Sequence, residues 1–359
     1  MQHPEKEVAG GAARRTWFAG SGLLFLLLAA FLFLVTVASI LFGAMSIPFS
    51  SLAAVFLDAL GFEPDEEVIK GHQYIIIHLR LPRALFAILI GSSLSVAGAM
   101  MQGLFRNPLA DPGLLGVSSG AALGAALVIV LGFTLPVFPA LTLPLFAFAG
   151  GVIATIVVMR LSFRGNKASV ANMLLAGIAI NAVCGAGTGL LVYMSDDEQL
   201  RTLTFWTMGS VGGASWDNLP YVVMFAFIPA LVGLPLARSI NALLLGESEA
   251  HLLGVKVEQL KLIIIVLVCI MVGTSVSLTG MIGFVGLVVP HLCRLVFGAD
   301  NRKVILGSLL LGATLLLGAD LVSRTVVSPA ELPIGIVTSI IGGPFFLSLL
   351  YRSRQGGIF

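Results

Sequence analysis

The sequence predicts an all-α polytopic membrane protein with ten transmembrane helices. Hydrophobic residues make up 58% of the 359 residues and charged residues only 11%, whereas a soluble domain carries about 25% charged residues. The mean hydropathy is +1.04, and uncharged runs long enough to cross a bilayer, about 20 residues each, recur along the chain. Polar side chains are too few to cover the surface of a water-soluble protein. These observations exclude a soluble enzyme, a disordered protein and a nucleic-acid-binding protein.

The transmembrane spans are expected where the uncharged runs lie. The first run is 16–57. The run 112–159 is too long for one crossing and is divided at Gly132 and the prolines that follow. Residues 262–293 carry no charge apart from His291, and the glycines near their end divide them into one full and one short helix. The ten spans are expected at 17–43, 82–104, 113–132, 139–160, 169–194, 217–238, 261–280, 283–298, 303–326 and 333–351.

The distribution of basic residues predicts which side of the membrane each loop faces. Ten spans place both termini on one side, and 14 of the 20 Lys and Arg residues fall there, against five on the other side, with Arg294 left uncounted. Because basic loops stay in the cytoplasm, we expect cytoplasmic tails at 1–16 and 352–359 and one membrane domain at 17–351. An alternative is a cleaved signal peptide after Arg15, but the apolar run is about twice the usual length for one.

Glycines and prolines predict a tightly packed bundle with broken helices. Glycine accounts for 41 residues, above the usual share of about 7%. Gly116, Gly120 and Gly124 repeat at every fourth position, which lets two helix backbones approach closely. Pro290 lies inside the short span at 283–298. Helices broken at membrane depth occur where protein or a water-filled cavity covers them, and they are typical of transporters.

The sequence contains no motif for catalysis, metal binding or nucleotide binding. It has no GxxxxGK[ST] loop to hold ATP phosphates and no HExxH pair. The three cysteines form no CxxC pair and imply no disulfide framework. The spans also lack the series of acidic residues that a proton-driven pump uses. We therefore expect no catalytic residue, no metal site and no permanently bound cofactor, and a transporter of this kind needs an external motor.

The segment between the sixth and seventh spans is the best candidate surface for that motor. Arg238–Lys261 is the longest internal connection on the side of the termini. A pair of short helices at about 239–258 that presents leucines to a partner's groove fits its pattern, and the alternative is a loop packed on its own bundle. The leucines concerned are Leu244, Leu245, Leu252 and Leu253.

Five separated motifs occur along the chain. They are LRLPR at 79–83, GAMMQGLFRNPLADPGLLG at 98–116, LGE at 245–247 with LG at 253–254, GFVGLVVPH at 283–291 and ELPIG at 331–335. Together they resemble the FecCD family of binding-protein-dependent permeases, the type II ABC importers for haem, siderophores and cobalamin. The resemblance extends from about residue 75 onward. It implies a cobalamin-permease-like fold in the bacterial inner membrane.

The resemblance also implies partners. The family works as a homodimer in the lipid bilayer, with the transport path along the dimer axis. Two ATP-binding subunits on the cytoplasmic side hydrolyse ATP, so this chain is not expected to be an enzyme, and one periplasmic substrate-binding protein delivers the substrate. A stand-alone secondary transporter is the alternative from another class. The lack of intramembrane acids and the leucine-rich segment both disfavour it.

Several residues match the family's functional positions. The resemblance assigns binding-protein docking to Arg80, Arg83 and Arg324, ATPase coupling to Gly246, Glu247, Leu253 and Gly254, and the cytoplasmic gate to Asn107 and Leu109, with a second gate element near Val170 and Ala171. The residues alone leave alternatives. Arg80 and Arg83 could anchor the second span at the interface. Arg324 could instead pair with Asp320, four residues before it.

The substrate is expected to be haem. The run NPLADPGLLGVSSGAALG at 107–124 looks most like the haem and cobalamin branches of the family, and ferric siderophore or cobalamin is the alternative substrate. Side chains that could contact haem iron in transit are Met100, Met101, Met208, Tyr193 and His78. The alternative for the three methionines is packing, which is the commoner use of methionine in helices.

Overall fold

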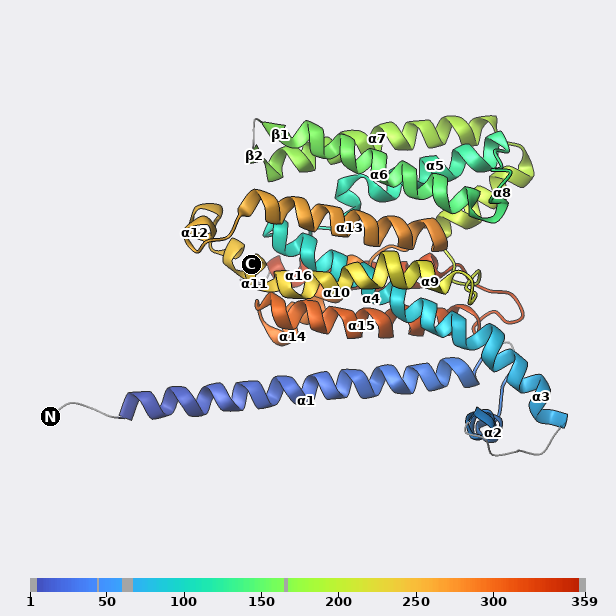
Figure 1. Cartoon of the computed structure of the whole chain (residues 1–359), viewed down its shortest axis with the longest axis horizontal. Coiled ribbons are helices and arrows are strands. Elements are labelled where there is room, and N and C mark those ends of the chain that lie inside the picture. The colour runs from blue at the N-terminus through green and yellow to red at the C-terminus, as the bar shows by residue number, and fades with distance from the viewer. Residues whose placement is uncertain (1–4, 44, 60–66, 165–166, 355–359) are drawn as a thin grey trace.

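Ten apolar helices form the body of the protein. The computed structural model describes residues 5–43, 45–59, 67–164 and 167–354. Within this part, seven helices are long and apolar enough to cross a membrane, and three apolar helices are shorter. Figure 1 shows them lying roughly side by side along the long axis of the molecule. The predicted all-α class and the predicted number of spans are confirmed.

Each expected span has its counterpart in chain order. Nine of them are single helices: α1 (Glu5–Leu41), α4 (Leu81–Phe105), α5 (Val117–Leu131), α6 (Thr142–Ser162), α7 (Val170–Met194), α13 (Val257–Thr279), α14 (Val285–Phe297), α15 (Asn301–Ser323) and α16 (Ile334–Arg354). The sixth span is a continuous run of short pieces: α9 (Leu219–Val222), the π-helix η4 (Val223–Phe227), α10 (Ile228–Gly233), the 3₁₀-helix η5 (Leu234–Leu236) and α11 (Ala237–Leu244). Helix therefore covers the described parts of both expected tails, while residues 1–4 and 355–359 lie outside the described residues.

The two ends of the bundle carry different additional elements (Figure 1). We call one the α12 end, because it holds α12 (Glu247–Leu252) and an antiparallel hairpin of β1 (Phe163–Arg164) and β2 (Lys167–Ala168). We call the other the α8 end, because it holds α8 (Asp197–Met208), together with α2 (Phe49–Ala59) and α3 (Glu67–Tyr74). The hydropathy pattern predicted neither the hairpin nor these three helices.

The second span is longer than expected, because helix begins well before Leu81. Helix α3 continues through the π-helix η1 (Ile75–Arg80) directly into α4. Pro82 does not interrupt this run, since proline is tolerated in the first turn of a helix and the π-turn shifts the hydrogen-bond register just before it. The result places Arg80 and Arg83 on helix at the α8 end of the bundle.

The third span is shorter than expected. Its 15-residue helix α5 is about 22 Å long at 1.5 Å per residue, less than the roughly 30 Å of a bilayer core. A 3₁₀-turn, η2 (Pro112–Leu115), precedes it, and Gly116 adopts φ +79° between the two. The carboxylate of Asp111 accepts the N–H of Gly113 at 2.7 Å and begins the turn. Leu115 and Gly116 are buried, so this irregular backbone lies within protein, as a membrane requires.

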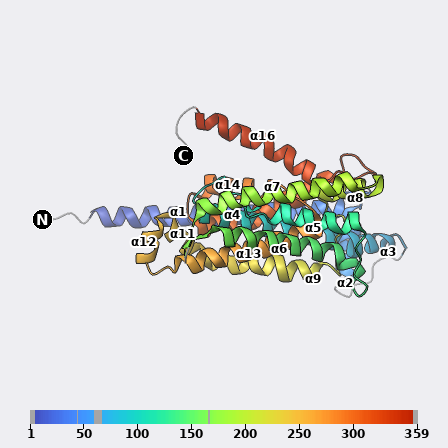
Figure 2. The same cartoon turned by 90° about the horizontal axis from the view of Figure 1, so that it is seen from above.

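Glycine permits the closest helix crossings. A Cβ on Gly98 of α4 would lie 1.6 Å from the carbonyl oxygen of Gly286 in α14. Gly120 of α5 and Gly150 of α6 oppose each other in the same way, with Cβ-to-oxygen distances of 2.4 and 2.2 Å. No side chain fits at such separations, so the predicted role of the small-residue face on the third span is confirmed. Helix α16, by contrast, diverges from the bundle toward its C-terminal end (Figure 2).

Candidate functional site

A cluster of charged side chains joins three segments at the α8 end. Arg83 of α4 donates to Asp320 of α15, with Nη2 2.8 Å from Oδ1, and to both carboxylate oxygens of Glu331 at 2.8 and 2.9 Å. The Asp320 side chain is 1% exposed, whereas that of Glu331 is 44% exposed. Hydrogen bonds from Arg83 lower the pKa of Glu331, which lies in the loop before α16. The cluster therefore has a buried centre and one solvent-facing carboxylate.

Two further arginines in this cluster hold the end of α1. Arg80 donates to the carbonyl oxygens of Ile40 and Leu41 at 2.6 and 2.8 Å, and also to that of Met45. Arg324 donates to Ser39 and lies 3.3 Å from Asp320. The last carbonyls of a helix lack partners within the helix and attract positive charge, so both side chains stabilise this terminus.

The structure distinguishes between the two interpretations of Arg324, which were docking to a partner and pairing with Asp320. Arg324 pairs with Asp320 and is buried, as the pairing alternative predicts. Arg80 is also buried. Arg83 and Glu331 form the part of the cluster that reaches the surface. Docking of a carboxylate-bearing partner by the three arginines stays a prediction, and Arg83 is the member best placed for it.

The α12 end carries an exposed apolar surface. Leu252 and Leu253 are 87% and 64% exposed, and Leu245 is also exposed, whereas Ala250 on the inner side of α12 is buried. The residues Gly246 and Gly254, which bracket the helix, adopt φ +129° and +83°. These glycines allow the tight turns that turn the leucines outward. We call Leu245, Leu252 and Leu253 the leucine surface.

Glu247 takes a different direction from the leucines. Its carboxylate lies 2.8 Å from Nζ of Lys261 in α13. The expected gate residues also lie in turns near this end: Asn107 accepts the N–H of Leu109 at 2.9 Å, and both residues are exposed just after α4. Val170 and Ala171 form the start of α7, separated by one residue from the end of β2. Their roles as gates stay predictions.

The expected haem-contacting residues lie in three different environments. Met100 and Met101 have no exposed surface and lie in the main hydrophobic core, which is the packing alternative. Tyr193 is 88% exposed on α7, and His78 is exposed before α4. Met208 lines a groove of about 520 Å³ between the end of α8 and the start of α16. The sequence did not single out Met281, which also lines this groove.

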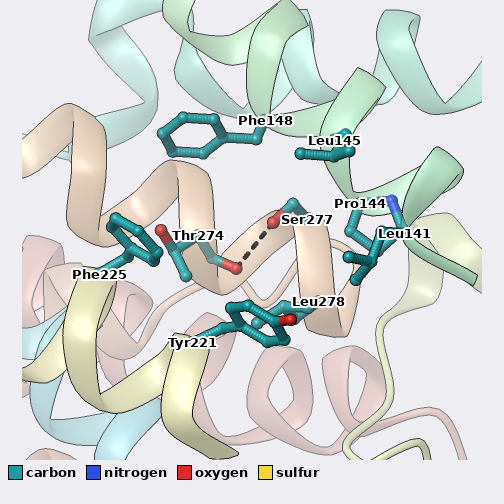
Figure 3. Close-up of a pocket in the computed structure, with 9 residues that line it drawn as sticks. All are labelled: Leu141, Pro144, Leu145, Phe148, Tyr221, Phe225, Thr274, Ser277 and Leu278. Atoms are coloured by element: carbon teal, nitrogen blue, oxygen red, sulfur yellow. Dashed lines mark hydrogen bonds between the residues drawn. The ribbon is translucent and has the colours of Figure 1, made fainter. Parts of the chain in front are cut away.

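A second cavity is apolar and unrelated to any expected site residue. It has a volume of about 230 Å³ and opens between α6, the sixth span and α13. Figure 3 shows Phe148, Tyr221 and Phe225 around it, and the hydroxyl of Ser277 donating to the carbonyl of Thr274 at 3.0 Å. Because the Ser277 hydroxyl donates within its own helix, the cavity presents a mainly apolar lining.

A polar network that the sequence did not reveal lies near the end of α4. Arg294 of α14 donates to Gln102 at 3.3 Å and to Asn301 at 3.0 Å. Asn301 donates in turn to Asn241 of α11 at 2.8 Å. The network therefore joins the last turn of α4 to α11, the helix that leads into α12. The only sequence signal was Arg294 itself, a cation near a helix end.

Comparison with known proteins places these features in a family. The sequence pattern of the FecCD transport family matches residues 29–352. The hemin transport system permease protein HmuU of Yersinia pestis is 50% identical over 283 residues, covering 79% of this chain and 84% of that protein. The vitamin B12 import system permease protein BtuC of Klebsiella pneumoniae is 41% identical over 295 residues, covering 82% and 87%. A solved inward-facing metal-chelate type ABC transporter superposes with a TM-score of 0.81 at 33% identity, covering 92% of this chain and 99% of that one.

Proposed function

Because the chain belongs to the FecCD transport family, we propose that it is the permease subunit of an ATP-driven importer that moves haem across a bacterial inner membrane. The main evidence for haem as the substrate is the 50% identity to a hemin transport permease over 79% of the chain. The groove beside Met208 and Met281 supports it, since thioethers are known iron ligands of haem. Haem is here the transported substrate, and the chain holds no cofactor permanently.

The leucine surface is the proposed contact for the ATP-binding subunits. An exposed helix with adjacent leucines fits a hydrophobic groove on a partner protein. Two such subunits would bind at the α12 end of a homodimer, one to each copy of this chain, and would hydrolyse ATP. This orientation makes the α12 end cytoplasmic, in agreement with the excess of basic residues on that side. Both termini are then cytoplasmic.

The Arg83–Glu331 pair is the proposed contact for the periplasmic binding protein. Arginine binds carboxylates through two parallel hydrogen bonds, and Arg83 already makes this bidentate pair with Glu331. A carboxylate on the binding protein would exchange with the half-exposed Glu331 at low cost, because surface ion pairs contribute little free energy. One binding protein would span the α8 ends of both copies.

Uptake of defined substrates tests the proposed function. The permease, its ATP-binding subunit and its binding protein would be reconstituted in proteoliposomes, and accumulation of haem would be measured with and without ATP. We expect ATP-dependent uptake of haem that an excess of cobalamin or ferric siderophore does not reduce. Uptake of cobalamin in place of haem would favour the second candidate substrate, which the 41% identity to a vitamin B12 permease supports.

A further inference from the structure

The side chain of Lys261 is buried at the α12 end and is surrounded by two partly exposed carboxylates and a backbone carbonyl. Lys261 is in the first turns of α13 and its side chain is 2% exposed. Its Nζ atom lies 2.8 Å from Glu247 and 3.1 Å from Glu258. It also donates to the carbonyl oxygen of Ala168 at 2.9 Å. One ammonium group therefore holds three oxygen atoms from three segments.

A second hydrogen bond fixes the hairpin to the same cluster. The other carboxylate oxygen of Glu258 accepts the N–H of Ala168 at 2.9 Å. Both backbone polar groups of Ala168 are thus engaged by side chains of α13. Ala168 ends β2, two residues before α7 begins at Val170. The cluster joins α12, the start of α13 and the segment that enters α7.

Burial of the Lys261 ammonium group favours an arrangement in which all three oxygen partners stay in place. A buried ammonium group without a partner is costly, because it has lost its contact with water. Movement of α12 or of the hairpin away from Lys261 removes one of the three partners of its ammonium group. Glu247 lies at the first position of α12, while the leucine surface is on the outer side of that helix. A partner that displaces the leucines must therefore move Glu247 as well.

We propose that Lys261 is a positioning residue that transmits displacement of α12 to the β1–β2 hairpin and the start of α7. This inference rests on the proposed function, since the displacement comes from an ATP-binding subunit on the leucine surface. It gives Glu247 an inward role, in transmission, rather than a contact with the ATP-binding subunit. It also gives Val170 and Ala171 a mechanical connection to that subunit, through the backbone of Ala168.

Two alanine variants on the same helix test the transmission. Glu247→Ala removes the α12 branch of the cluster and leaves Lys261 paired with Glu258 and Ala168. Glu249→Ala is the matched control, because Glu249 is exposed on α12 and makes no ion pair in the described part of the chain. Both variants would be assembled with the ATP-binding subunit, and substrate uptake per ATP hydrolysed would be measured.

We expect Glu247→Ala to retain the ATP-binding subunit but to lower uptake per ATP by about tenfold, a typical size for coupling between two sites. Glu249→Ala should match the unmodified protein. Equal uptake per ATP in the two variants would overturn the proposal. So would loss of the ATP-binding subunit from Glu247→Ala alone, because the carboxylate would then contact that subunit directly.

A distance measurement separates this inference from the proposed function. Spin labels at His251→Cys on α12 and Ala171→Cys on α7, both exposed positions, would report the relative movement of the two segments. In the permease alone, we expect one narrow distance distribution, which broadens in the Glu247→Ala background and stays narrow in the Glu249→Ala background. An unchanged distribution in Glu247→Ala would refute the connection. Absence of ATP-driven uptake by the unmodified complex would refute the proposed function and leave this distance result standing.

Discussion

Replacement of Asp320 by asparagine is expected to lower the free energy of unfolding by about 3 kcal/mol. The carboxylate is almost fully buried and is shared by Arg83 at 2.8 Å and Arg324 at 3.3 Å. Arg324 has no other carboxylate within ion-pairing distance in the described part of the chain, so the substitution leaves its buried charge unpaired. Removing one partner of a buried ion pair costs about 3–5 kcal/mol. The lower value applies because Arg83 retains Glu331.

The assay is equilibrium unfolding in mixed micelles titrated with a denaturing detergent. Glu331→Gln is the matched control, because it removes the exposed partner of the same arginine and is expected to cost about 1 kcal/mol or less. The order of the two variants is the decisive result. If Asp320→Asn costs no more than Glu331→Gln, the buried cluster does not stabilise the junction of α1, α4 and α15, and the reasoning is refuted.

Three other predictions concern packing, partner binding and acid stability. Gly98→Ala should prevent accumulation of folded protein, since its Cβ would lie 1.6 Å from a carbonyl oxygen of α14. The control Gly185→Ala, whose Cβ would have no neighbouring atom within 4 Å, should accumulate normally. Equal yields by fluorescence-detected gel filtration would contradict the close crossing of α4 and α14. Leu252→Asp with Leu253→Asp should abolish co-purification of the ATP-binding subunit without lowering the melting temperature, since both side chains are exposed; a complex that co-purifies intact would count against the leucine surface. The ion pair with Arg83 lowers the pKa of Glu331, so its contribution to folding stability is present above the ordinary carboxyl pKa of 4.5 and is lost as pH falls through the lower folded value. Melting temperatures measured across this range should fall more steeply with acid for the unmodified protein than for Glu331→Gln. Parallel curves would exclude the pair as a source of stability.

The positions of the spans could be predicted because the bilayer sets the length of an apolar helix. Each of the ten expected spans has an apolar helical counterpart, including the short one that contains Pro290. Helix α8 was missed because it is amphipathic and polar at its start, where Asp196 and Gln199 form a capping box. Its apolar residues do not produce a membrane-length run, and the capping pattern alone was the available signal.

The candidate site could be predicted only where a motif marks a surface. The leucine surface followed from apolar residues in a loop, and its exposure agrees with the expectation. The partners of Lys261 could not be predicted from the sequence, because Ala168 lies 93 positions from Lys261 along the chain. Arg80 looked like a surface cation, yet the helix that precedes Leu81 and the end of α1 enclose it. Pairings between distant segments depend on tertiary packing, which no local pattern encodes.

The dependence of transport on a separate ATP-binding subunit is the central claim, and substrate uptake in proteoliposomes tests it most directly. The same vesicles would be assayed with the ATP-binding subunit present, with it omitted, and with an ion gradient in place of ATP. The account predicts uptake only when the subunit, ATP and the loaded binding protein are all present. Uptake driven by an ion gradient in vesicles that contain this chain alone would contradict it.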